Sequence, residues 1–227
     1  MYKYFLPYDV FERHKKVGSL IKKNQSILDV GGELDHLSQF CSPKKLVVAN
    51  LHSGDVIISK EKLPFKKDSF DIVCSIDVIE HIPSSKRSHF IKKLIDIASK
   101  KVILSFPIGT KKHIAYERKM QKLLTKKEID IDYLNEHIRY GLPTQEDVNK
   151  FTQGDKTQIY YAGNLNINKI LLQIYLFDPK INIVRKAVYY SKMIFNLVTN
   201  QFLYSILINK DYSESVNRAY VIINKNK

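Results

Sequence analysis

A glycine pair at the end of a short apolar segment is the first feature of this sequence that could do chemistry. Residues 27–30 read Ile-Leu-Asp-Val and run directly into Gly31-Gly32. An apolar run of this length predicts one buried strand. Glycines directly after a strand let the backbone approach a ligand that a Cβ atom would block. Asp29 would then point a carboxylate across the same crevice; the alternative is a tight turn that only ends a core strand.

Two further polar residues stand where a predicted strand ends. Asn50 follows the apolar run 46–49, and Asp77 follows the run 70–76. Ligands of open α/β sheets bind outside the carboxyl ends of the strands, so both side chains are candidates to meet one ligand. The Asn50 amide could bond a diol or could end its strand in an Asx-turn. For Asp77 the alternative is a capping or turn aspartate.

Histidines and glutamates form a second group of candidates. His113 and Glu117 lie one turn apart on a predicted helix, and Glu136 and His137 are neighbours on another. Such pairs are common on helix surfaces, and the zinc-binding pattern HExxH is absent. The pattern therefore favours ordinary surface pairing, and no metal site is predicted.

The elements that must position these residues alternate along the chain. Strands are predicted at 27–30, 46–49, 54–59, 70–76, 102–106, 157–162 and 220–223. Helices are predicted at 9–23, after the glycine pair to about Cys41, at 84–98, in a lysine-rich stretch around His113, at 126–138, 165–177 and 184–208. The alternation predicts one α/β domain over 1–227: a Rossmann-like, doubly wound, mostly parallel seven-stranded sheet with helices on both faces. Residues 108–155 break it and predict a helical insertion or lid after the fifth strand.

Composition limits the class of partner. The 227 residues carry a formal net charge of +14, which raises nucleic acid and anionic membrane as partners. The surplus is mostly lysine in scattered pairs without interleaved aromatics, so no specific nucleic-acid binding is expected. The two cysteines form no disulfide framework, which fits a reducing, cytoplasmic location.

The apolar segment 184–208 approaches the length of a membrane span. It is interrupted by Lys192, Asn196, Asn200 and Gln201. Spanning segments rarely carry so much polarity. A buried helix, a homodimer face or a peripheral membrane contact is each a better interpretation than a span.

Residues 63–83 carry a resemblance to a known family. They read LPFKKDSFDIVCSIDVIEHIP and resemble the block LPF-x3-SFD-x-V-x-S-x-D-V-x-EH-x-P of class I S-adenosylmethionine-dependent methyltransferases. Ile27 to Gly32 stands at the matching distance upstream. The resemblance spans roughly 26–107 and continues weakly to about 145. The chain departs from the commoner D-x-G-x-G by one residue and has Asn50 where an acidic residue is usual.

The resemblance implies a set of cofactor-binding positions in the half of the chain formed by residues 1–107. They are Asp29, Gly31, Gly32, Asn50, Leu51, Ser59, Lys60, Ile76 and Asp77. The first three would flank the methionyl part of S-adenosyl-L-methionine, and the next two would meet its ribose and adenine. Ser59 and Lys60 would follow the adenine edge, and the last two would lie near the ammonium and sulfonium. Residues 156–227 would add the C-terminal strands and apolar helices.

The resemblance also implies the reaction: in-line methyl transfer to a small-molecule or to a glycan or lipid-linked acceptor. A general base is needed only if the acceptor must lose a proton, and His81 and His113 are the candidates for that catalytic role. Two alternatives stay open, an RNA methyltransferase and a non-catalytic binding protein that keeps the fold. An RNA methyltransferase would bind with a steep salt dependence.

Overall fold

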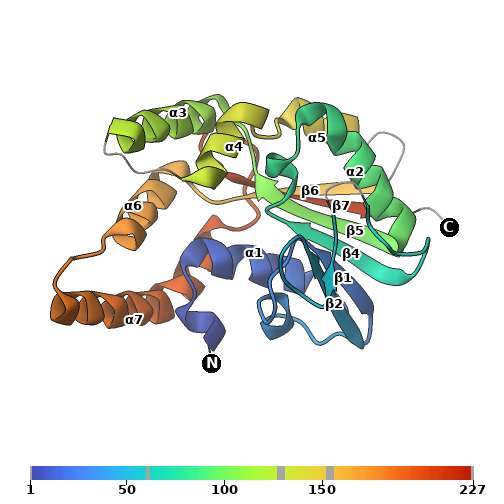
Figure 1. Cartoon of the computed structure of the whole chain (residues 1–227), viewed down its shortest axis with the longest axis horizontal. Coiled ribbons are helices and arrows are strands. Elements are labelled where there is room, and N and C mark those ends of the chain that lie inside the picture. The colour runs from blue at the N-terminus through green and yellow to red at the C-terminus, as the bar shows by residue number, and fades with distance from the viewer. Residues whose placement is uncertain (1, 60–61, 127–130, 152–155, 226–227) are drawn as a thin grey trace.

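A seven-stranded sheet forms the centre of the computed structural model, which describes residues 2–59, 62–126, 131–151 and 156–225 (Figure 1). The strand order is β3-β2-β1-β4-β5-β7-β6. The strands are β1 Ser26–Val30, β2 Lys45–Asn50, β3 Val56–Ile57, β4 Phe70–Ile76, β5 Ala98–Pro107, β6 Lys156–Ala162 and β7 Arg218–Asn224. The pairs among β1 to β5 are parallel, and β7 is antiparallel to β5 and β6. The predicted Rossmann-like, mostly parallel seven-stranded sheet is confirmed.

Seven α-helices and three short 3-10 helices belong to the described part of the chain. The α-helices are α1 Tyr8–Ser19, α2 Ser84–Ile97, α3 Lys111–Lys126, α4 Asp132–Tyr140, α5 Gln145–Phe151, α6 Leu165–Leu176 and α7 Asn182–Leu207. The 3-10 helices are η1 Tyr2–Phe5, η2 Leu37–Gln39 and η3 Ile79–His81. α3, α4 and α5 follow β5, where the sequence predicted a helical insertion. α5 was not predicted as a separate helix.

The core has two layers because successive side chains of a strand point to opposite faces of the sheet. Val73 of β4 belongs to the cluster that includes Leu94 of α2. Its neighbour Ile72 belongs to the cluster that includes Val17 of α1. Helices therefore cover both faces of the sheet, as predicted. The polar residues at the ends of the strands lie at one edge, outside these two layers.

One predicted element near the glycine pair is wrong, and another is shorter than predicted. No α-helix runs from the pair to Cys41; the segment contains only η2. Asp35 has a left-handed φ of 66°, which ends a helix, and Leu34 is 52% exposed rather than packed. The strand predicted at 54–59 shrinks to Val56–Ile57.

The helix predicted at 126–138 begins at Asp132, and residues 127–130 lie outside the described part of the chain.

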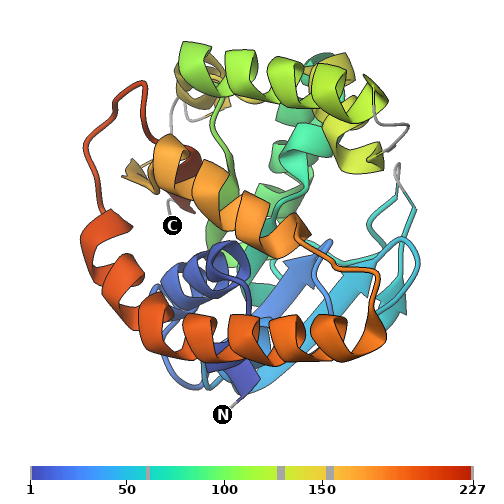
Figure 2. The same cartoon turned by 90° about the vertical axis from the view of Figure 1, so that its left-hand side faces the viewer.

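α7 lies along the N-terminal segment at one side of the molecule (Figure 2). Asn200 donates its side-chain N–H to the carbonyl oxygens of Tyr4 and Leu6, at 3.2 and 2.9 Å. Apart from Asn200, only Leu207 of this helix is buried, so the buried-helix interpretation of 184–208 is wrong. Within the described residues, no helix combines the length and apolar character that crossing a bilayer would require.

Candidate active site

The turn after β1 requires glycine at both of its positions. Gly31 has a φ of 85°, and a Cβ atom there would lie 2.2 Å from Cγ2 of Val78. A Cβ atom on Gly32 would lie 2.1 Å from Oδ2 of Asp29. The backbone N–H of Gly31 donates to the carbonyl oxygen of Ala49 at 2.7 Å. The turn therefore joins the ends of β1 and β2 and packs against the loop after β4.

Asp29 lies directly beneath this turn and is fully buried. Neither of its carboxylate oxygens has a hydrogen-bond partner among the residues that the structure describes. Burial without a partner raises the pKa of Asp29 to about 7. A buried acceptor without a donor calls for a ligand or water. A cationic ligand such as the ammonium of S-adenosylmethionine fits this carboxylate, and the bare glycine backbone fits its close approach.

Asn50, at the end of β2, holds the turn in place. Its side-chain N–H donates to the carbonyl oxygens of Gly31 and Gly32, at 3.2 and 2.8 Å. Its side-chain oxygen accepts from the backbone N–H of Leu51 at 2.6 Å. The amide is thus already engaged within the chain. Contact of Asn50 and of the half-buried Leu51 with a ribose or adenine stays a prediction.

Ser59 and Lys60 are the two residues predicted to lie along the adenine edge of the cofactor. Ser59 is exposed, and its hydroxyl accepts from the backbone N–H of Lys62 at 3.1 Å. Lys60 lies outside the described residues. Both roles stay predictions.

The end of β4 carries a paired charge. Ile76 is buried, and Asp77 follows it with a left-handed φ of 54°. The Asp77 carboxylate lies 2.5 Å from Nη1 of Arg13 in α1 and also pairs with Arg218 of β7. Burial alone would raise the pKa of Asp77, but the two guanidinium groups lower it to about 2. Asp77 is therefore a fixed anion at the edge of the sheet.

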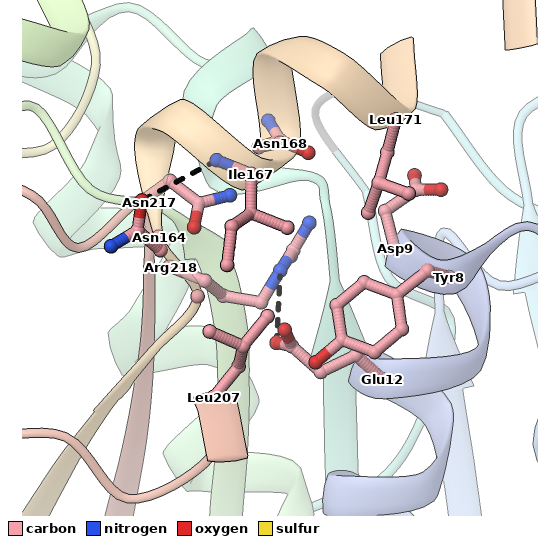
Figure 3. Close-up of a pocket in the computed structure, with 11 residues that line it drawn as sticks. Tyr8, Asp9, Glu12, Asn164, Ile167, Asn168, Leu171, Leu207, Asn217 and Arg218 are labelled. Carbon is pink, nitrogen blue, oxygen red and sulfur yellow. Dashed lines mark hydrogen bonds and ion pairs between the residues drawn. The ribbon is translucent and has the colours of Figure 1, made fainter. Parts of the chain in front are cut away.

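Arg218 also faces a second buried carboxylate (Figure 3). Its Nε lies 3.9 Å from Oε1 of Glu12, which in turn accepts from the Tyr220 hydroxyl at 2.7 Å. The small pocket beside them, drawn in Figure 3, has a volume of about 10 Å³, room for about one water. Arg218 lines both this pocket and a much larger cavity.

The larger cavity has a volume of about 380 Å³. That is within the range of small-molecule sites. Residues of α1, α3, α4, α6 and α7 line it together with the loop after β4. Asp77, His81 and His113 all face it. The structure thus brings both predicted catalytic histidines to one cavity that also contains a predicted cofactor-binding residue.

Each cavity histidine is held by an acceptor at Nδ1. His81 Nδ1 lies 2.7 Å from Oε2 of Glu136, and His113 Nδ1 lies 2.8 Å from the carbonyl oxygen of Ile108. A carbonyl or carboxylate can only accept, so Nδ1 carries the proton and Nε2 keeps its lone pair. Burial lowers the pKa of both His81 and His113 below the ordinary value for histidine. Both are neutral bases near pH 7.

The histidine–glutamate pairs differ from those suggested by sequence spacing. Glu117 lies 3.8 Å from Nε2 of His113 but 2.9 Å from Nδ1 of His137. Glu136 pairs with His81, across 55 residues, rather than with its neighbour His137. Histidine–glutamate pairs therefore join α4 both to α3 and to the loop after β4.

Arg87, fully buried in α2, fixes the loop that carries Glu80 and His81. Its Nε donates to the carbonyl oxygens of Ile79 and Ile82, both at 3.0 Å. Its Nη2 donates to the carbonyl oxygens of Tyr140 and Gly141 at the end of α4. One guanidinium thus holds η3 against α4 and sets the distance between His81 and His137.

Sequence reasoning missed Arg13, Arg218 and the partners of His137. Arg13 is 64 residues and Arg218 is 141 residues from Asp77 along the chain. No local pattern marks such a pairing. The only available signal was that Arg13 belongs to the predicted helix 9–23 and that Arg218 lies two residues before the predicted closing strand, in a chain whose cations are mostly lysines.

Comparison with known proteins gives a consistent result. Residues 35–105 match the family model described as a methyltransferase domain. No curated protein matches the chain. Among solved structures, the chain is similar to a SAM-dependent methyltransferase from Archaeoglobus fulgidus, with 14% identity, a TM-score of 0.57 and coverage of 96% of this chain and 94% of that one. It is also similar to a SAM-dependent methyltransferase from Thermotoga maritima, with 11% identity, a TM-score of 0.56 and coverage of 98% and 93%.

A third similar structure is phosphoethanolamine N-methyltransferase 2 of Haemonchus contortus in complex with S-adenosyl-L-methionine. It shares 14% identity and a TM-score of 0.53, over 93% of this chain and 51% of that one. At these identities the likeness establishes the fold, which is that of the class I methyltransferases. The methyltransferase domain model matches residues 35–105, a stretch that lies within this fold.

Proposed function

We propose that the protein methylates a small molecule bound in the 380 Å³ cavity, with S-adenosylmethionine held at the glycine turn. One observation carries this proposal. The loop after β4 faces both places: Val78 packs against the Gly31 position, while Asp77 and His81 line the cavity. A methyl donor at the turn and an acceptor in the cavity would therefore meet across a single loop.

The residues of the chain have separable tasks in this proposal. The Gly31-Gly32 backbone permits close approach, and Asp29 supplies a negative charge beneath it. Asp77, fixed by two arginines, supplies a second negative charge at the cavity wall. S-adenosylmethionine, when bound, supplies an electrophilic methyl group on a sulfonium. The protein mainly has to hold the two reactants in line and exclude water.

His113 is the proposed base for an acceptor that must lose a proton. Its Nδ1–H is fixed by Ile108, so the lone pair on Nε2 is available, and the residue is 5% exposed on the cavity wall. A hydroxyl acceptor would donate its proton to Nε2 as its oxygen becomes nucleophilic. His81, also a neutral base, is the second candidate.

The size of the cavity supports a small molecule over RNA. An RNA methyltransferase must admit a base and bind the phosphate backbone around it, usually with arginine-rich surfaces. The arginines at this site, Arg13 and Arg218, are instead paired with Asp77. The Haemonchus contortus protein, whose name gives phosphoethanolamine as substrate, shows that this fold accommodates small acceptors.

A lipid-linked acceptor is a more specific proposal, supported by the surface of α6 and α7. Ile174 and Tyr175 of α6 line the cavity and are themselves 36% and 59% exposed. Next to them α7 exposes apolar residues over most of its length; Ile183 is 82% exposed and Val198 70%. Exposed apolar patches of this extent mark interaction surfaces. With the exposed Lys180, Arg185 and Lys186 nearby, the composition suits an anionic membrane interface.

The proposal is tested with S-adenosylmethionine labelled on its methyl group. Purified protein is incubated with the labelled donor and a cell extract, which is then separated into water-soluble small molecules, lipids, RNA and protein. Label in the small-molecule or lipid fraction supports the proposal and distinguishes its two forms. Label in RNA supports the alternative activity, and no label in any fraction supports a non-catalytic protein.

The membrane contact is tested separately by co-sedimentation with anionic and with neutral vesicles. The double variant Ile183→Asp with Val198→Asp should lose binding to anionic vesicles, while a Leu123→Asp control on α3, also exposed, should keep it. Dimerisation through α7, the other interpretation, would appear in sedimentation without vesicles as a dimer that the double variant abolishes.

A further inference from the structure

Three side chains on the cavity wall converge in the way metal ligands do. Glu80 and His81 come from η3, and His137 comes from α4. One potential ligand atom from each lies within 4.8 Å of the other two. Around a zinc ion with bonds of about 2.1 Å in tetrahedral geometry, such atoms lie about 3.4 Å apart. Small side-chain rotations would bring the three onto one ion.

Both histidines are oriented as metal-binding histidines are. His81 Nδ1 is held by Glu136 at 2.7 Å, and His137 Nδ1 is held by Glu117 at 2.9 Å. A carboxylate at one ring nitrogen fixes the tautomer and raises the basicity of the other nitrogen. In both rings this leaves the Nε2 lone pair to bind an ion.

Two of the three side chains also have a buried polar atom without a partner. Oε2 of Glu80 and Nε2 of His137 have no hydrogen-bond partner among the described residues, although the side chains are nearly inaccessible, at 1% and 7% exposed. Buried acceptors of this kind point to an ion or a water that completes them. The charged groups beyond Glu80 are Asp77, Arg13 and Arg218. The Asp77 carboxylate is already paired with both arginines.

We propose that Glu80, His81 and His137 bind a divalent transition-metal ion of the zinc type, with its remaining positions open to the cavity. Two histidines and one glutamate form a ligand set used by catalytic zinc, and by non-haem iron, and in both cases positions are left for substrate. The spacing of histidines and glutamates within the sequence did not predict this site, because the three ligands come from two separate segments.

The open positions indicate what the ion does. An acceptor hydroxyl bound there would be acidified: its O–H bond would break, the electron pair would stay on oxygen, and the proton would pass to Nε2 of His113. This role rests on the proposed methyl transfer and favours acceptors with a hydroxyl group. The binding of the metal itself does not depend on that function.

The site is tested by titrating metal-depleted protein with Zn²⁺ in a calorimeter and by recording the visible spectrum after Co²⁺ is added. Wild type should bind one ion and give the absorption of a low-coordinate cobalt site. His81→Gln and His137→Gln should each abolish the cobalt bands. Glu117→Gln, which would act on the metal through His137, should weaken Zn²⁺ binding about 10- to 100-fold.

Controls separate the site from binding at other histidines. His89→Gln on the exposed surface of α2 should bind Zn²⁺ like wild type. Circular dichroism shows whether each variant is folded, and His81, which is only partly buried, is the variant expected to fold without difficulty. Equal Zn²⁺ affinity in wild type, His81→Gln and His137→Gln would overturn the proposal.

S-adenosylhomocysteine is titrated into the same preparations. Binding of S-adenosylhomocysteine without Zn²⁺ binding refutes the metal site and leaves the proposed function standing. Zn²⁺ binding without S-adenosylhomocysteine binding supports the metal site and refutes the proposed function.

Discussion

Nη1 of Arg13 lies 2.5 Å from the carboxylate of Asp77, so a side chain of the N-terminal helix closes onto the end of β4. Arg218 from the closing strand reaches the same carboxylate from β7. The N-terminal helix and the closing strand thus meet at Asp77, where the proposed cofactor-binding edge adjoins the cavity. This contact makes the site depend on the complete fold rather than on the segment 26–107 alone.

Loss of Arg218 should destabilise the protein strongly. Arg218→Met leaves the buried carboxylates of Asp77 and Glu12 without their shared cation, which should lower the free energy of unfolding by about 3–5 kcal/mol. Urea denaturation measures the change. The matched control is Arg185→Met, whose ion pair with Asp178 is about half exposed and should contribute about 1 kcal/mol or less. Equal losses in the two variants would contradict the assignment of a buried charge network.

Asp29 should make the stability of the ligand-free protein depend on pH. In the unfolded chain this carboxyl ionises near pH 4, whereas in the folded protein burial raises its pKa to about 7. The folded state therefore holds the proton more tightly, and the free energy of unfolding falls as the pH rises from about 4 to about 7.

Asp29→Asn should remove that fall, so the variant should exceed wild type at about pH 8 by up to about 4 kcal/mol and differ little at about pH 4. Urea denaturation across this range, with the exposed Asp178→Asn as control, measures it. A variant that follows the wild-type curve in parallel would show that Asp29 is not the group responsible.

His113 should set the acid limb of the rate profile if the acceptor is a hydroxyl. Because burial lowers the pKa of His113, wild-type kcat should rise with pH below about 6.5 and be level above it. His113→Asn should lower kcat by about 100- to 10,000-fold and remove this limb. His89→Asn serves as the control. An unchanged acid limb in His113→Asn would assign the base elsewhere, with His81 as the next residue to test.

Arg87 should be sensitive even to a conservative change. Lysine cannot replace a planar guanidinium that donates to the carbonyl oxygens of Ile79, Ile82 and Gly141 at once. Arg87→Lys should therefore lower the free energy of unfolding by about 2–3 kcal/mol. Arg139→Lys on α4 is a suitable control, because that side chain is exposed and lysine can also make its cation–π contact with the neighbouring Tyr140 ring. Equal stability of both variants would show that the clamp contributes little.

The mostly parallel, doubly wound architecture of the sheet was predictable because strand and helix patterns alternate and parallel strands connect in one hand. The glycine pair, Asn50 and Asp77 each stand directly after an apolar run, so their meeting at one edge follows from that topology. Contacts at the edge confirm it: Asn50 donates to the carbonyl of Gly32, and Ser75 of β4 donates to the carbonyl of Val30.

The wall of the cavity was not predictable in the same way. His81 and His113 were candidates because of their residue type, but their partners come from segments that no local pattern connects. The apolar pattern of 184–208 predicted a helix, yet it could not show whether other residues cover it, and most of its apolar side chains are exposed. The helix after the glycine pair failed because Asp35 adopts a left-handed φ that the apolar spacing does not reveal.

The central claim is that the turn above Asp29 binds the adenosyl-sulfonium cofactor, and calorimetric titration with S-adenosylhomocysteine tests it most directly. Wild type and the exposed control Asp178→Ala should bind with equal affinity, while Asp29→Ala, folded by circular dichroism, should bind at least about 10-fold more weakly, the loss of one charged contact of about 1.4 kcal/mol or more. Absence of heat in wild type, or equal affinity in Asp29→Ala, would contradict the account.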